Sequence, residues 1–442
     1  MRIAWFSPLP PTRSGIAAYS AEVLPLLTTR GHEIEIFTAA AASDFVWKQR
    51  RSPYDLTVYQ LGNAECHDYM WAYLFRYPGL VVLHDAQLHQ SRALALTRRW
   101  MPRRDDYHEE FRANHPDAPA DIANLVAAGL GGSLFHLWPM ITLVIETARL
   151  TVVHNQLLRE ALQRRYPAAR LDHVTMGVRD PLDAPIADSK LRAIRERLRI
   201  PPEAMVVAAF GGVTREKRLD VLFNAIGGIA DRHPQLHVML AGPTTDHYDV
   251  ATEARRWGIA DRVHLAGYVP DTELPAYLAT ADVCACMRWP SNGETSASWL
   301  RCLAAGRATI ITDLEYLCDV PTFDPRGWRL LDISPPEATR PPVAVSIELI
   351  DELHSLQLAL DRLAGEPSLR SSLGTAGRAW WQRHHQVPAM AAAYDRILSA
   401  AAAIPAPTRS LPRHLIDDGW TRGQSIGEEM GIGNRLGEFP RR

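Results

Sequence analysis

Hydrophobic positions along the chain form short apolar runs that alternate with longer stretches of helical spacing. Residues 3–6 are an apolar run, and a turn-rich segment separates them from residues 16–29, whose apolar positions recur at helical intervals. Residues 33–37 alternate like a second strand. A strand, a helix and a strand in this order predict a right-handed crossover between parallel strands. Further buried strands are expected at 56–60, 80–83 and 150–153.

The second half of the chain repeats this plan. Strands are expected at 205–210, 236–241, 263–266, 283–287 and 309–312, and helices between them at 219–230, 271–280 and 296–305. Strands that alternate with helices predict an α/β fold, here two Rossmann-like doubly wound domains that face a central cleft. The expected domains are residues 1–180 and 181–385, joined by a linker at 180–190 that is rich in Pro, Asp and Ala.

Three more helices are expected near the C-terminus, at 351–365, 369–383 and 388–403. After residue 404 the periodic pattern fades. Residues 405–442 are polar with scattered Gly, Pro and Arg, which predicts a poorly ordered tail.

Composition narrows the class of protein. The chain has 442 residues, 47% of them hydrophobic and 22% charged, as in globular proteins, and its formal net charge of −2 gives no overall basic face for nucleic acid. Five cysteines without paired spacing, and a start that enters directly into a strand, favour a cytoplasmic setting. The apolar segment 130–145 is too short to span a membrane, so we expect at most a weak contact with the inner face of a membrane.

The loop 211–217 follows an apolar strand and has the sequence Gly-Gly-Val-Thr-Arg-Glu-Lys. Glycines such as Gly212 let the backbone approach a ligand, and Lys217 and Arg215 add positive charge, which together suit a pyrophosphate. A tight turn with a solvated basic cluster explains the same residues. The spacing alone does not decide between these two interpretations.

The loop 288–298 also follows an expected strand and opens a helix. Glu294, Thr295 and Ser296 could hold the hydroxyls and phosphate of a sugar nucleotide. Helix capping explains Thr295 and Ser296 without any ligand.

Two candidates lie in the first half of the chain. Gly15 ends a turn-rich loop and would let a helix N-terminus approach a ligand, although a simple chain reversal is the alternative. His84 ends the apolar run 80–83, where it could contact a sugar hydroxyl or carry a proton, although a purely structural histidine is the alternative.

As a set, these motifs resemble the retaining glycosyltransferases of family 4, which have the GT-B fold. The resemblance covers about residues 1–400 and depends on 10–19, 210–217, 264–269 and, above all, Gly-Glu-Thr-Ser at 293–296 followed by 303–307. The Gly-Glu-Thr-Ser sequence indicates a branch of that family.

The resemblance implies transfer of a sugar from a nucleotide diphosphate sugar to an acceptor hydroxyl, with retention of anomeric configuration and with neither a metal nor a cofactor. The acceptor, a glycan, a lipid-linked sugar or a small molecule, would meet the domain 1–180, and the donor the domain 181–385. A last helix at 386–404 would cross back to the first domain. The resemblance also assigns roles to individual residues. Lys217 would hold the diphosphate, and the backbone of Val269 would contact the base. Thr295 and Ser296 would lie at the sugar and phosphate end, Gly15 would contact the donor, and His84 would contact the transferred sugar. His84, Lys217 and Glu294 are the candidate catalytic residues.

Two departures leave alternatives open. Family 4 enzymes usually carry two glutamates, and the corresponding positions here hold Gly293 and Arg301, with Glu294 one step away. The arginine that usually precedes the loop lysine aligns with Gly212, and Arg215 could replace it. An epimerase that acts on nucleotide diphosphate sugars, or a catalytically silent subunit that binds them, therefore remains as an alternative.

Overall fold

A computed structural model describes residues 1–98, 102–245, 248–331, 340–417 and 420–431. The chain divides into two compact units. Unit 1 consists of residues 1–8, 34–151 and 400–442, and unit 2 of residues 9–33 and 152–399. The expected domain boundaries, including the crossing helix at 386–404, stay a prediction.

Within the described residues, the first sheet has six strands in the order β2-β1-β3-β4-β5-β6. The strands are β1 (Arg2–Phe6), β2 (Glu33–Phe37), β3 (Leu56–Leu61), β4 (Leu80–Leu83), β5 (Leu150–Val153) and β6 (Leu171–His173). β3 runs parallel to both β1 and β4. Every side chain of β3 and β4 is buried. β4 is apolar throughout, as buried parallel strands usually are, whereas β3 also buries the polar residues Thr57 and Gln60.

The helices of this half are α1 (Gly15–Thr29), α2 (Asp44–Arg51), α3 (Trp71–Leu74), α4 (His89–Thr97), α5 (Arg104–Asn114), α6 (Asp121–Ala127), α7 (Leu134–Leu137), α8 (Thr142–Thr147) and α9 (Gln156–Arg165). Helices α4 to α6 share a small core of their own, which includes Leu96, Tyr107, Phe111 and Val126.

The second sheet lies in unit 2, in the order β13-β12-β14-β11-β10-β7-β8-β9. Its strands are β7 (Met205–Phe210), β8 (Leu236–Ala241), β9 (Val263–Gly267), β10 (Val283–Cys286), β11 (Ala308–Thr312), β12 (Thr322–Asp324), β13 (Arg329–Leu330) and β14 (Ala344–Ile347). Neighbouring strands in this sheet are parallel, except that β12 and β13 are antiparallel.

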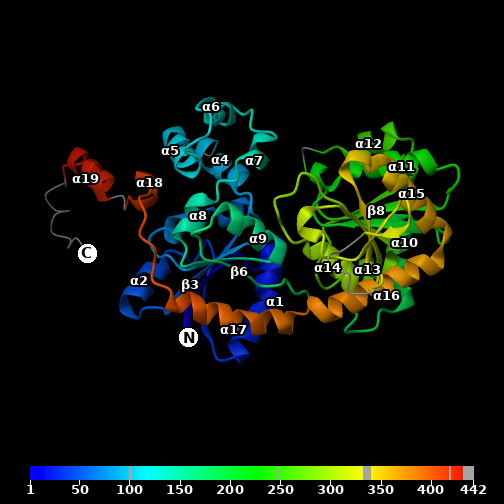
Figure 1. Ribbon diagram of the computed structural model, residues 1–442, viewed down its shortest axis with the longest axis horizontal. Coiled ribbons are helices and arrows are strands. Elements are labelled where there is room, and N and C mark those ends of the chain that lie inside the picture. Colours follow the sequence, from blue (N-terminus) through cyan, green and yellow to red (C-terminus); the bar gives the residue numbers. More distant parts are fainter. Residues whose placement is uncertain (99–101, 246–247, 332–339, 418–419, 432–442) are drawn as a thin grey trace. The chain divides into compact units, whose positions relative to one another are not determined.

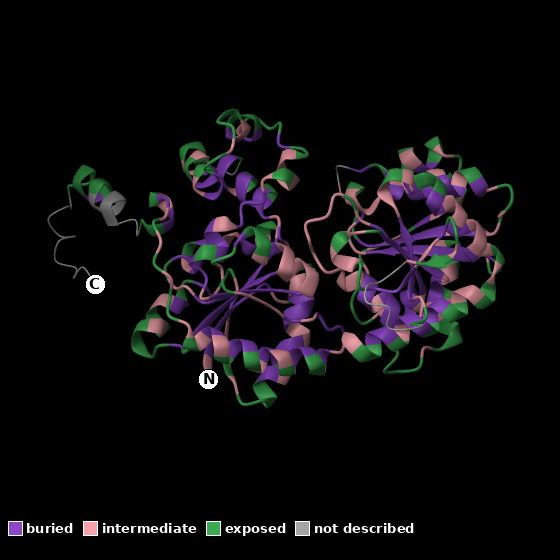
Figure 2. Cartoon of the chain, in the orientation of Figure 1, coloured by how far each residue is buried: buried purple, intermediate pink, exposed green. Residues whose placement is uncertain are grey.

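Helices cover both faces of this second sheet (Figures 1 and 2). They are α10 (Asp188–Leu198), α11 (Leu219–Ile229), α12 (Val250–Arg256), α13 (Leu274–Thr280), α14 (Ala297–Ala304), α15 (Glu352–Gly365) and α16 (Pro367–His384). In β7, Val207 packs in a core with α11 and α15, whereas its neighbour Val206 packs in a second core with α10 and α13. Alternate side chains thus enter opposite layers, which makes β7 apolar at every position.

The C-terminal helices are α17 (Val387–Ala403), α18 (Arg413–Ile416) and α19 (Trp420–Glu429). α18 and α19 fall within the segment expected to be a poorly ordered tail, and residues 418–419 and 432–442 of that segment lie outside the described residues. In the part of the chain that the structure describes, no helix has the length and apolar character needed to cross a bilayer.

Some sequence-based expectations were wrong in detail. The helix expected at 271–280 begins at Leu274, because Pro275 favours the first turn of a helix. Helix α10 begins at Asp188, inside the expected linker. The apolar segment 130–145 contains α7 and the first part of α8, with Pro139 between them.

Candidate functional site

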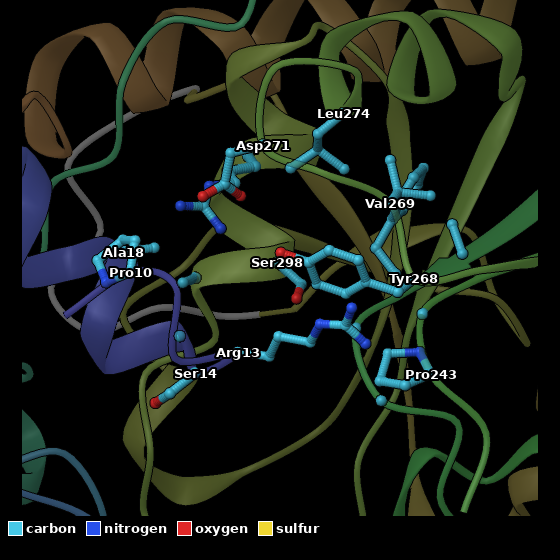
Figure 3. Close-up of a pocket in the computed structure, with 18 of the residues that line it drawn as sticks. Pro10, Arg13, Ser14, Ala18, Pro243, Tyr268, Val269, Asp271, Leu274 and Ser298 are labelled. Carbon is cyan, nitrogen blue, oxygen red and sulfur yellow. The ribbon is translucent and has the colours of Figure 1, made fainter. Parts of the chain in front are cut away.

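A pocket of about 350 Å³ lies in unit 2, next to the carboxyl ends of β7, β8 and β9 (Figure 3). This is the edge at which open α/β sheets bind their ligands. Its lining comprises residues 10–15, Ala18, residues 210–212, residues 241–243, Tyr268, Val269, Asp271, Leu274, Leu278, Ala297, Ser298 and Arg301.

Glycine backbone forms one wall of this pocket. Gly211 has a φ of +91°, a conformation that side chains disfavour. Its N–H donates to the carbonyl oxygen of Ala241 at 2.9 Å, and a Cβ at Gly242 would lie 2.0 Å from the carbonyl oxygen of Gly211. The backbones of the loops after β7 and β8 are therefore in contact. Because Gly211 and Gly242 have no side chains, this wall leaves space in the pocket for a ligand.

Lys217 lies directly behind this glycine wall. Its ammonium donates to the carbonyl oxygen of Phe210 and lies 3.1 Å from the point that a Cβ of Gly211 would occupy. Burial, followed by the nearby charge of Arg288, lowers the pKa of Lys217 to about 8. Neither Lys217 nor the exposed Arg215 is part of the pocket lining. A ligand beyond Gly211 would thus meet the charge of Lys217 through the glycine backbone.

Polar groups of the loop 288–298 bond to one another within the loop. The Glu294 carboxylate lies 2.6 Å from Nε of Arg288 and accepts hydrogen bonds from Ser291 Oγ at 3.0 Å and from the Asn292 N–H at 2.7 Å. With Thr295 and Ser296, Glu294 lines a separate cavity of about 40 Å³. These three predicted residues are therefore outside the larger pocket.

Ser296 has the role that the capping interpretation gave it. It is the N-cap of α14, and its Oγ accepts from the Trp299 N–H at 3.2 Å. The cap places Ala297 and Ser298, the first residues of α14, in the lining of the larger pocket. The unpaired amides of a helix N-terminus favour an anion there.

Residues 10–15 contribute another wall. Ser14 caps α1 by accepting from the Ile16 N–H at 3.2 Å. Gly15 lines the pocket, and a Cβ there would meet no protein atom within 4 Å. Protein packing thus leaves the space next to Gly15 open. Arg13, which the sequence analysis did not single out, extends toward the ring of Tyr268 (Figure 3).

Arg301 forms an ion pair that the sequence analysis missed. Its Nη2 donates to Glu22 Oε1 at 3.0 Å, and Glu22 Oε2 accepts from the Arg179 N–H at 3.1 Å. A further cavity of about 360 Å³ is lined by residues of α1, α13 and the segment 179–183, and shares Arg301 with the first pocket. Opposite charges at positions 22 and 301 were visible in the sequence, but no local pattern connects them.

His84 belongs to unit 1, whereas the other predicted site residues belong to unit 2. His84 is buried after β4, and its Nε2 lies 2.7 Å from the side-chain oxygen of Gln60, which accepts the hydrogen bond. Among the predicted residues, Gly15, Gly212 and Val269 line the 350 Å³ pocket. The ligand contacts that the resemblance implied for all of them stay predictions.

Comparison with known proteins shows which protein family part of this chain matches. Residues 204–328 match the protein family described as glycosyl transferases group 1. That segment contains β7 to β12 and both polar loops. The two-sheet α/β architecture also matches solved GT-B glycosyltransferases, so the expected fold class is confirmed.

Three individual proteins are similar to this chain in sequence or in structure. Mannosylfructose-phosphate synthase of Agrobacterium fabrum is 28% identical over 137 residues, which are 29% of this chain and 29% of that protein. Sucrose-phosphate synthase of Thermosynechococcus elongatus has a TM-score of 0.60 at 17% identity, over 90% of this chain and 98% of that one. Anabaena HepE, solved with UDP and glucose, has a TM-score of 0.58 at 14% identity, over 90% of this chain and 100% of that one.

These matches cover different shares of the similar proteins. The curated relatives are matched over between 29% and 56% of their own length. The solved structures are matched nearly in full, and at 14% and 17% identity they show the fold alone. The comparisons therefore place a glycosyl transferases group 1 domain within a chain of the GT-B fold.

Proposed function

We propose that this protein transfers a sugar from a nucleotide diphosphate sugar to an acceptor hydroxyl and retains the anomeric configuration. One observation carries the proposal: the segment that matches glycosyl transferases group 1 forms much of the 350 Å³ pocket, with Lys217 behind its glycine wall. Support for the donor class comes from similar proteins: Anabaena HepE has been solved in complex with UDP-glucose, and a mannosyltransferase of Mycolicibacterium smegmatis is GDP-mannose-dependent. Retention rests on the resemblance of the motifs to family 4.

The leaving group of this reaction is a nucleoside diphosphate, so the protein must stabilise negative charge as the sugar departs. Lys217 supplies a positive charge, and the N-terminus of α14 supplies amide donors at Ala297 and Ser298. These groups are fixed before the reaction begins, so they cost little reorganisation when the charge develops. In this proposal they act on the diphosphate without a metal or a cofactor.

Product analysis tests the proposal. The full chain is incubated with UDP-glucose or GDP-mannose, with and without a panel of glycan, lipid-linked and small-molecule acceptors, and products are identified by mass spectrometry and NMR. We expect a glycosylated acceptor whose anomeric coupling matches that of the donor. An inverted product would refute retention and leave sugar transfer standing.

The same assay separates the two alternatives. An isomerised nucleotide sugar formed without acceptor would identify an epimerase. Donor binding without transfer to any acceptor would identify a silent binding subunit, the alternative that Arg301 motivates. The Glu22–Arg301 ion pair is relevant here, because it neutralises the charge that Arg301 brings to the pocket.

Donor binding is expected to weaken as the pH rises through about 8. Lys217 attracts the diphosphate as an ammonium, and with a pKa lowered to about 8 it is charged below that pH and neutral above it. The dissociation constant for UDP or GDP, whichever binds, should increase by up to about tenfold per pH unit above the pKa. Calorimetric titrations between pH 7 and 9.5 measure it.

Lys217→Arg is the matched variant for this pH dependence, because a guanidinium stays charged over the whole range. Its affinity should change little with pH. An equally steep loss of affinity in Lys217→Arg and in the wild type would mean that another group titrates.

A further inference from the structure

Two arginine side chains line the 350 Å³ pocket, and they differ in their surroundings. Arg301 is paired with Glu22 at 3.0 Å, and both side chains are largely buried. Arg13 is exposed, and within the described ranges no carboxylate forms an ion pair with it. Asp271, the acidic residue of the lining, is also exposed and forms no ion pair with Arg13. Arg13 thus gives the pocket a positive charge that no described protein group neutralises.

The partner of Arg13 in the structure is an aromatic ring. Its guanidinium carbon lies 4.3 Å from the ring centroid of Tyr268 (Figure 3). Tyr268 is 44% exposed. It follows Gly267, the last residue of β9, which has a φ of +68°. One face of an exposed aromatic ring in the pocket is therefore covered by a side chain that belongs to a different wall.

We propose that Arg13 binds the diphosphate of the nucleotide sugar, and that its move from Tyr268 to the diphosphate uncovers the tyrosine ring for the nucleobase. This inference rests on the proposed function, because it names a further donor-binding residue of the same pocket. A guanidinium carries five N–H donors in a plane that matches two phosphate oxygens at once. Its attraction to an exposed ring is weaker than a charge-assisted hydrogen bond, so a diphosphate displaces the ring as its partner.

The position of Arg13 complements that of Lys217. Lys217 lies behind Gly211, whereas Arg13 approaches from the segment 10–15 and enters the pocket itself. A diphosphate next to the glycine wall would thus be attracted by two positive charges: the fixed charge of Lys217 behind the wall and the mobile charge of Arg13 in the pocket. Because the ring of Tyr268 is released only when Arg13 turns to the diphosphate, the two halves of the donor bind cooperatively.

Binding measurements on the full chain test this inference. Inorganic pyrophosphate probes the diphosphate site alone, and uridine and guanosine probe the base site alone. UDP and GDP contain both parts. We expect Arg13→Gln to raise the dissociation constant for pyrophosphate by about tenfold or more, with Arg13→Lys in between. The affinity for the nucleoside should not fall, because Tyr268 is then uncovered.

Tyr268→Leu is the complementary variant. It should weaken nucleoside binding and should not lower the affinity for pyrophosphate, because the ring that competes for Arg13 is then absent. Arg256→Gln is the matched control: Arg256 also lies over an aromatic ring, that of Trp257 at 5.1 Å, but on α12 and outside the pocket. It should bind every probe as the wild type does. Equal thermal unfolding of all variants shows that the fold is unchanged.

Two results would overturn the role of Arg13 while the proposed function stands. In one, Arg13→Gln binds pyrophosphate as tightly as the wild type. In the other, it loses nucleoside and diphosphate affinity by the same factor. A wild-type protein that binds neither pyrophosphate nor any nucleoside diphosphate would instead refute the proposed function, and this inference with it.

Discussion

Lys217→Ala should lower the turnover of sugar transfer by about 10²–10³-fold, the range seen when one preorganised donor to a developing negative charge is removed. Its ammonium lies 3.1 Å from the Cβ position of Gly211, at the wall of the pocket where the proposed leaving group would carry its charge. The protein should stay folded, because no acidic residue in the described part of the chain forms an ion pair with Lys217 and would be left buried and unpaired. Initial rates at saturating donor, with circular dichroism as the check of folding, measure both effects.

Lys190→Ala is the control for this experiment. Lys190 is an exposed lysine of α10 in the same unit, so its removal subtracts the same charge without altering the pocket. It should leave turnover unchanged. Wild-type turnover in Lys217→Ala would remove Lys217 from the mechanism, and an equal loss in both variants would show that only the net charge matters.

Gly242→Ala should destabilise the protein and abolish donor binding. A Cβ at this position would lie 2.0 Å from the carbonyl oxygen of Gly211, a backbone atom that cannot rotate away. The loop 211–217 must then move away from the loop after β8, which disturbs the glycine wall and the position of Lys217. Overpacking of this kind costs about 1–3 kcal/mol in the free energy of unfolding. Urea titration measures that cost, and calorimetry with pyrophosphate measures binding.

Gly365→Ala provides the comparison. A Cβ at Gly365, the last residue of α15, would meet no atom within 4 Å, so the free energy of unfolding should change by less than about 0.5 kcal/mol. If Gly242→Ala were as stable as Gly365→Ala and still bound pyrophosphate, the close approach of the two loops would not be what shapes the pocket.

Helices and strands with a strong period were predictable because their pattern is local. The strand 236–241 and the helix 219–230 match β8 and α11 almost to the residue. The strands β12 and β13 were not predicted, because two or three residues are too few to establish a period; β14 was not predicted either.

The candidate site was predictable only in part, and the reason lies in the polar side chains. The sequence located the two loops, but Glu294 bonds to Ser291 and Asn292 within its own loop and lies outside the larger pocket. Residue type and spacing do not show whether a carboxylate points toward a cavity or back into its loop. Arg13 was missed for a related reason, since a lone arginine in a turn carries no periodic signal.

The sequence by itself determined the order of strands and helices, the two-part α/β class and the glycine-rich loop at the end of β7, because near neighbours along the chain decide these features. Only the tertiary structure decided the partners of the charged groups. Arg301 bonds to Glu22 across 279 positions, and Arg13 covers Tyr268, which belongs to a different loop. Such pairs follow from how the elements pack, since a charge takes the partner that the fold brings within reach, whatever its distance along the chain.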